Sequence, residues 1–251
     1  MASNITKFYF YRYFLTFAFF YTTFVIFLQS KGFSLTQIAF IFSAHSATAL
    51  IMEVPGGAFA DTYGKKLSIV IGTLGVTASF FINGIGLRYF DFIIAAIIGG
   101  IGWSLISGAD NALIHISLDS IGKKDDYTRV QGKATAISRF SNALGGFFGG
   151  LLFVISTRLP LLVTAGSTLI AFFIALTFKK PRVKDEEIKP SAIQVIKESF
   201  LIIKHQPQLI WLTIFTSFLT AILWSINVVV QPYMKLVGIP VQYFGAVLGG
   251  I

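Results

Sequence analysis

The chain has no cysteine and few charged residues, and these two shortages exclude several classes of protein. Without cysteine, no disulfide, thiol chemistry or cysteine-ligated metal site can form. Charged residues make up 12% of the 251 residues, about half the share that a soluble domain carries. The sequence also has no Gly-x-x-x-x-Gly-Lys-Ser/Thr loop and no His-Glu-x-x-His motif. We therefore expect no ATP drive within this chain, no zinc hydrolase chemistry and no metal or other cofactor.

Long apolar runs stand where the charges are missing, because 55% of the residues are hydrophobic. Each run of about 20 residues can cross a bilayer core of about 30 Å as a helix. Barrel strands would instead alternate apolar and polar residues over about 10 positions. We predict an all-α membrane protein. The predicted helices are Phe8–Leu28, Ile38–Ala60, Leu67–Leu87, Phe92–Leu118, Ala134–Ile155, Leu159–Phe178, Leu209–Val230 and the start of an eighth at Val241–Ile251.

The net charge of +9 is distributed unevenly along this topology. Most Lys and Arg residues fall in the connections on the side of the amino terminus. Lys31, Arg88, Arg158 and Lys235 fall in connections on the other side. By the positive-inside rule, this asymmetry predicts a cytoplasmic amino terminus and a multi-pass protein of the cell membrane, the cytoplasmic membrane of a bacterium. It also explains the positive charge without a nucleic-acid partner.

The connection between the second and third predicted helices carries the motif Gly57-x-x-x-Asp61-x-x-Gly64-Lys65-Lys66. It resembles the signature loop of the major facilitator superfamily (MFS), in which the loop acts as a conformational switch against the second half of the protein. Gly57 would let two helices approach closely, and Asp61 would cap the start of another helix. Gly64 would permit a left-handed turn, and the lysines would lie at the anionic inner leaflet.

The resemblance implies two six-helix halves related as parallel repeats. Residues 1–178 would form the amino-terminal half and residues 209–251 the start of the second half, namely helix seven and part of helix eight. Residues 179–208 would form a cytoplasmic linker, either with a helix lying flat on the membrane or solvated throughout. Gly32 and Gly238 open similar segments 206 residues apart, so the repeat logic predicts a complete chain of roughly 385 residues.

Polar residues within the apolar runs are candidates for contact with a substrate. Ser107, Asn111 and His115 form one stripe on the fourth helix, and such a stripe faces the bundle interior or a watery cavity. Its role is either hydrogen bonding between helices or substrate contact. In this family the first and seventh helices line the central cavity, so their polar residues are further candidates: Tyr21, Thr22, Thr220, Trp224 and Asn227. His45, near the middle of the second predicted helix, is another.

Three charges lie at a similar predicted depth within the membrane: Glu53, Asp110 and Arg139. An isolated charge there costs about 2.5–3.5 kcal/mol, so we expect a buried network in which Arg139 bridges the two carboxylates. The surplus negative charge suggests a proton-coupling site. The alternative is a static brace between three helices.

The resemblance implies a secondary active transporter that moves a small solute by alternating access, with a proton or another ion as coupling partner. Efflux of drug-like or amphipathic compounds is the first hypothesis, and uptake of a sugar or other metabolite is the second. A truncated non-transporting fragment, or an assembly partner, is the third, because the sequence stops within the eighth run. No enzyme is expected, since Ser107 and His115 would lie about 12 Å apart along one helix.

Overall fold

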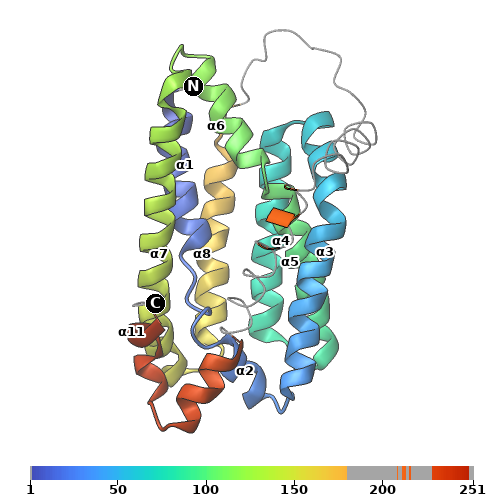
Figure 1. The fold of residues 1–251 in the computed structure, drawn as a ribbon, viewed down its shortest axis with the longest axis vertical. Coiled ribbons are helices and arrows are strands. Elements are labelled where there is room, and N and C mark those ends of the chain that lie inside the picture. The colour runs from blue at the N-terminus through green and yellow to red at the C-terminus, as the bar shows by residue number, and fades with distance from the viewer. Residues whose placement is uncertain (1, 180–207, 209–210, 213–214, 216–227, 249–251) are drawn as a thin grey trace.

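The computed structural model describes residues 2–179, 208, 211–212, 215 and 228–248, which form a bundle of upright helices without strands (Figure 1). Five spans are long and apolar enough to cross a membrane: Leu35–Thr62, Lys65–Ile85, Tyr89–Asp119, Lys124–Ile155 and Leu159–Leu176. They confirm the second to sixth predicted helices. The elements are α1 (Ala2–Thr16), α2 (Phe24–Ser30), α3 (Leu35–Thr62), α4 (Lys65–Ile85), α5 (Tyr89–Ile106), α6 (Ala109–Asp119), η1 (Lys124–Asp126), α7 (Tyr127–Ile155), α8 (Leu159–Leu176), η2 (Val241–Tyr243) and α11 (Phe244–Leu248).

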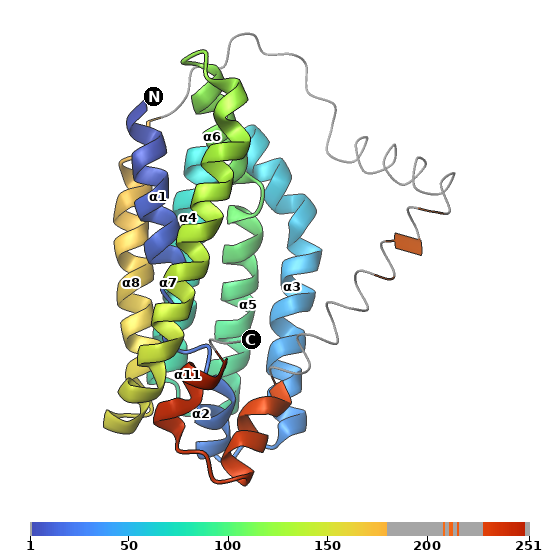
Figure 2. The same cartoon turned by 60° about the vertical axis from the view of Figure 1, so that its left-hand side comes forward.

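The five membrane spans run alternately up and down, with α5 and α6 forming one span, so their connections gather at two ends of the bundle (Figures 1 and 2). The start of α1, the α3–α4 turn and the connection from α6 to α7 share one end, and α2 and α11 lie at the other. α5 packs against α3 and α4, α4 packs against α8, and α1 packs between α7 and α8. Helices α1, α3, α4, α5 and α7 surround a central space.

Local sequence signals set the ends of α3. The Ser34 Oγ accepts a hydrogen bond from the Gln37 backbone N–H (3.2 Å), and the Gln37 Oε1 accepts one from the Ser34 N–H (2.9 Å). These reciprocal bonds form a capping box, which satisfies two donors at the helix start. At the other end, Gly64 has φ +99°, the left-handed region predicted for this turn, which glycine adopts without strain.

The first predicted helix, Phe8–Leu28, was expected to be continuous, but the structure shows a break in it. α1 ends at Thr16 and α2 begins at Phe24, so residues 17–23 form a non-helical segment within the bundle. Non-helical backbone is tolerated inside a membrane only where protein or a cavity surrounds it. The stretch Phe-Ala-Phe-Phe-Tyr-Thr-Thr contains no glycine or proline, so the sequence itself gives no signal for the break.

Groups from distant parts of the chain satisfy the backbone of this segment. The Thr164 Oγ1 accepts a hydrogen bond from the Phe19 N–H (2.9 Å). The Gln231 side chain, which is 3% exposed, spans the far end of the break. Its Oε1 accepts from the Val25 N–H (3.0 Å), and its Nε2 donates to the Tyr21 carbonyl (2.9 Å). In a continuous helix the Val25 N–H would donate to the Tyr21 carbonyl, and the carboxamide of Gln231 satisfies both of these groups instead.

Glycines on α7 make room for the same segment. A Cβ on Gly145 would lie 2.6 Å from the Ala18 carbonyl oxygen, and one on Gly149 would collide with that of Phe19. The GGFFGG stretch of residues 145–150 thus serves close approach, as its GxxxG spacing indicates, and its partner is an irregular segment. Because the segment packs against α7 here, its other side faces the enclosed space.

The fourth predicted helix, Phe92–Leu118, is also divided. α5 ends at Ile106 and α6 begins at Ala109, with Gly108 at φ +73° between them. Glycine reaches this left-handed conformation without the penalty of a Cβ, so here the sequence does contain the cause of the break. The division places Asp110 in the first turn of α6, where the helix dipole favours an acidic side chain.

The proposed echo between Gly32 and Gly238 has a structural counterpart in two matching turns. Gly32 has φ +86° and Gly238 has φ +79°. The Phe33 N–H donates to the Leu28 carbonyl (3.3 Å), and, 206 residues later, the Ile239 N–H donates to the Met234 carbonyl (3.0 Å). This is the hydrogen bond of a Schellman helix end. The helical residues before the second turn reach 236, beyond the predicted end at Val230. Val25 and Gln231, which are joined by a hydrogen bond, are also 206 residues apart and are therefore equivalent positions of the repeat.

Close contact between α4 and α5 yields a first prediction. A Cβ on Gly72 would lie 2.7 Å from the Gly102 carbonyl oxygen. We expect Gly72→Ala to lower the free energy of unfolding by about 1–3 kcal/mol through overpacking, measured by thermal unfolding of the purified chain in detergent. Gly166→Ala is the matched control, because nothing lies within 4 Å of a Cβ there. Equal stability of the two variants would contradict this account.

The carboxamide that bridges the break in helix one yields a second prediction. Gln231→Leu removes the hydrogen bonds from the Val25 N–H and to the Tyr21 carbonyl, and a buried group left unsatisfied costs about 1–3 kcal/mol. Gln29→Leu is the control, since within the described residues the Gln29 side chain makes no hydrogen bond. If thermal unfolding showed Gln231→Leu to be as stable as this control, the bridging role would be wrong.

Candidate functional site

A cavity of about 510 Å³ lies inside the bundle. Its wall combines aromatic rings with scattered polar groups, as in sites for small amphipathic molecules. The broken helix one contributes to it, and so do α3, α4, α5, α7 and the helical residues 228–236. The aromatic lining residues are Phe20, Tyr21, Phe24, Phe42, Phe80, Phe92 and Trp103, and the polar ones are Thr16, His45, Ser79, Asn83, Arg139, Asn142 and Gln231.

The predicted substrate-contact residues divide into three groups. Tyr21 and His45 line the cavity. Thr22 is instead buried against α7, where its Oγ1 donates to the Gly146 carbonyl (3.1 Å). Thr220, Trp224 and Asn227 lie outside the described residues. Adjacent side chains of the irregular segment thus face different surroundings, Tyr21 the cavity and Thr22 the backbone of α7.

The predicted polar stripe of the fourth helix does not line this cavity. The Ser107 Oγ donates to the Glu53 Oε1 (3.0 Å). The Asn111 Oδ1 accepts from the Gln131 Nε2, and the His115 ring packs edge-on against Tyr127 with centroids 5.2 Å apart. The division at Gly108 separates these residues from Trp103 on α5. They serve contacts between helices near the end of the bundle that carries the α3–α4 turn, which was the alternative reading of the stripe.

Several lining residues escaped the sequence analysis. Asn83 and Phe80 lie on α4, Trp103 on α5 and Asn142 on α7. Their polar or amphipathic character within apolar runs is a signal that sequence reasoning can use. Gln231 is different, because it lay just beyond the predicted end of helix seven. Only the extension of that helix to residue 236 brings it into the bundle.

A buried ion pair joins α1 and α6. The Arg12 Nη1 lies 2.9 Å from the Asp110 Oδ2, and the Arg12 Nε donates to the Ser138 Oγ (3.2 Å). The Asp110 Oδ1 also accepts from the Asn111 backbone N–H (2.7 Å). The Asp110 side chain is 5% exposed. Such a carboxylate needs a charged partner and hydrogen bonds to be retained inside a membrane protein, and this one has both.

In the expected network, Arg139 was to bridge Glu53 and Asp110, and this choice of the cation is wrong. Arg12, not Arg139, is the partner of Asp110. The phase of α7 gives the reason: Ser138 faces Arg12, and the next residue points about 100° away around the helix. Arg139 accordingly lines the cavity. Glu53 is exposed on α3 and accepts a hydrogen bond from Ser107.

The loop motif between α3 and α4 is only partly as predicted. Gly64 forms the left-handed turn. Asp61 pairs with Lys65 one turn along (2.5 Å), and Lys66 is partly exposed beside it. Gly57 has nothing within 4 Å of a Cβ among the described residues, whereas a Cβ on Gly56 would lie 3.0 Å from the Ser104 carbonyl oxygen. The close approach of α3 to α5 thus occurs one residue before the motif begins.

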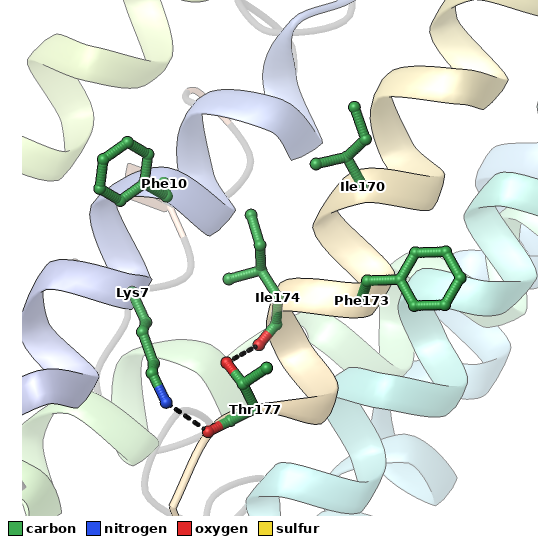
Figure 3. Close-up of a pocket in the computed structure, with 6 residues that line it drawn as sticks. All are labelled: Lys7, Phe10, Ile170, Phe173, Ile174 and Thr177. Atoms are coloured by element: carbon green, nitrogen blue, oxygen red, sulfur yellow. Dashed lines mark hydrogen bonds between the residues drawn. The ribbon is translucent and has the colours of Figure 1, made fainter.

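A second, shallower space of about 390 Å³ lies between α1 and α8 near the end where α1 begins (Figure 3). Its wall is almost wholly apolar. The Lys7 Nζ donates to the Thr177 carbonyl (2.7 Å), and the Thr177 Oγ1 donates to that of Ile174 (2.7 Å). Its polar groups are satisfied at the end of α8, and it lies apart from the central cavity. The lining residues are Lys7, Phe10, Ile170, Phe173, Ile174 and Thr177.

Comparison with known proteins shows the family of this chain. An uncharacterized MFS-type transporter of Bacillus subtilis, YxaM, is 26% identical over 237 residues, which cover 90% of this chain and 57% of that protein. Multidrug resistance protein 1 of the same species is 29% identical over 163 residues, 61% of this chain and 39% of its own. The crystal structure of the nucleoside transporter NupG superposes with a TM-score of 0.74 at 15% identity, over 98% of this chain and 62% of that one.

The chain thus spans about three fifths of the length of YxaM and of NupG. Residues 9–251, nearly the whole sequence, match the profile of one family of multi-pass membrane transport proteins. The helical bundle, the signature turn at Gly64 and the similarity to solved transporters agree with that match. This chain belongs to the Major Facilitator Superfamily.

Proposed function

We propose that this chain forms the amino-terminal half, and the start of the second half, of a secondary transporter that exports small amphipathic aromatic compounds across the bacterial cytoplasmic membrane. The observation that carries the proposal is the cavity of about 510 Å³. Its size suits one drug-sized molecule, and aromatic walls with few polar groups suit an amphipathic one. The name of one relative, Multidrug resistance protein 1, favours efflux over uptake of a sugar.

The contact between the two parts of the chain supports alternating access. Ile26, Met234 and Phe244 form one apolar cluster at the end of the bundle that carries α2 and α11. Val25 and Gln231, which are equivalent in the repeat, touch one another. Equivalent residues meet only near the axis that relates two repeats, so this end is closed around that axis. With the amino terminus in the cytoplasm, the closed end is the exterior one.

The buried pair Arg12–Asp110 is the proposed proton-coupling element, together with Glu53. A carboxylate in this environment either keeps its cationic partner or takes up a proton, because a lone buried charge is costly. Asp110 also lies in the first turn of α6, beside the division of helix four. Protonation would release Arg12 and loosen the contact between α1 and α6, which links a proton to a helix that borders the cavity.

Transport itself is tested with the complete protein, of which this chain is the proposed amino-terminal part, reconstituted in vesicles under an imposed pH gradient. Amphipathic aromatic dyes of different charge are supplied, and we expect movement of at least one that stops when an uncoupler collapses the gradient. Asn142→Trp should slow this movement, since the larger side chain fills the cavity that Asn142 lines. Ala143→Trp, exposed on the next position of α7, is the control. No gradient-dependent movement of any dye would refute the proposal.

Proton coupling is tested separately with Asp110→Asn and Glu53→Gln. Each amide imitates the protonated acid, so we expect the dependence of dye movement on the pH gradient to fall by about tenfold or more, which corresponds to about 1.4 kcal/mol. Exchange of dye without a gradient should persist. The double variant Arg12→Gln with Asp110→Asn controls for the cost of an unpaired Arg12, which is about 3–5 kcal/mol of stability. Unchanged pH-driven movement in both single variants would exclude coupling here.

A further inference from the structure

The charge of the central cavity is unbalanced. Among the described residues that line it, Arg139 carries the one formal charge, and no Asp or Glu accompanies it. The described part of the cavity wall is therefore positive, and an aromatic cation would meet repulsion there where an anion would meet attraction.

Arg139 has no counter-charge within the part of the chain that the structure describes. No ion pair or hydrogen bond engages its guanidinium there. Asp110 is occupied by Arg12, and Glu53 is turned toward Ser107. Arg139 lies near the middle of α7, where an uncompensated arginine costs about 2.5–3.5 kcal/mol. An intramembrane charge that faces a cavity is a candidate for contact with a substrate or an ion.

The rest of the cavity fits a flat ring. Phe20 and Phe80 lie with ring centroids 4.7 Å apart, and Phe24 meets Phe42 edge-on at 5.8 Å. Such rings offer faces and edges to an aromatic ligand. Asn83 adds a second polar contact. Its Nδ2 donates to the Ser79 carbonyl (2.9 Å), while its buried Oδ1 has no hydrogen-bond partner among the described residues.

We propose that the cavity binds small aromatic carboxylates, with the carboxylate on the Arg139 guanidinium and the ring among the phenylalanines. The inference rests on the proposed transport function and names its class of substrate. A guanidinium accepts a carboxylate through two parallel N–H···O bonds, which gives direction as well as charge. A neutral amide of the same shape lacks that charge, and an ammonium of the same shape opposes it.

The test compares three probes that share one ring: 4-nitrobenzoate, 4-nitrobenzamide and protonated 4-nitrobenzylamine. Nitroaromatic rings quench tryptophan fluorescence, and Trp103 lines the cavity, so binding is read from the purified chain carrying Trp211→Phe and Trp224→Phe. We expect 4-nitrobenzoate to bind at least about tenfold more tightly than 4-nitrobenzamide, which corresponds to about 1.4 kcal/mol. The ammonium probe should bind most weakly.

Variants then assign the preference to one side chain. Arg139→Gln should abolish the preference for 4-nitrobenzoate while binding of 4-nitrobenzamide persists, which also shows that the variant is folded. Arg139→Lys should keep part of it, because it retains the charge but not the paired N–H donors. Arg158→Gln, at the N-cap of α8, removes an equal charge outside the cavity and should change nothing.

Three results would overturn the inference: equal binding of benzoate and benzamide, tightest binding of the ammonium, or a benzoate preference that survives Arg139→Gln. These are distinct from failure of the transport proposal. Gradient-driven movement of dyes without any carboxylate preference would refute the substrate class alone. Carboxylate binding that depends on Arg139, without movement of any dye, would refute transport alone.

Discussion

The absence of water from a bilayer core is the constraint on which the rest of this structure depends. Every backbone N–H and C=O there must find a partner within the protein. Regular helices meet this demand by themselves, so the irregular residues 17–23 need outside help. They receive it from Thr164 on α8 and from Gln231 in the second part of the chain. The architecture around the break follows from the need to bring these two side chains to it.

Backbone close approach is the second consequence. Gly145 and Gly149 of α7 leave space for the carbonyls of the irregular segment, and Gly146 meets Gly245 of α11 in direct backbone contact. Neighbouring positions of α7 therefore pack against both parts of the chain. The side chains on the opposite side of the segment, including Phe20 and Tyr21, are left to line the cavity. The break in helix one thus builds a wall of the candidate binding site.

The intramembrane charges show why a membrane depth predicted from the sequence does not identify the partners of an ion pair. Arg12 and Arg139 both lie within predicted helices, and their predicted depth in the membrane favoured Arg139 as the partner of Asp110. In the structure α1 packs against α6, and Arg12 reaches Asp110 while Arg139 faces the cavity. The choice depends on which helices are neighbours and on the rotation of each about its axis. Neither quantity is available from hydropathy.

The sequence by itself determined the spans of the second to sixth helices and the left-handed turn at Gly64, because apolar length and glycine act locally. The fourth of these was predicted as one continuous helix, and its division at Gly108 appeared only in the structure. The sequence also indicated the family through the residues around the turn at Gly64. Only the tertiary structure decided the break at residues 17–23, the pairing of Arg12 with Asp110 and the exposure of Arg139 to the cavity. Each of these depends on groups more than 90 residues away in the chain, and a local pattern carries no information about which distant group completes it.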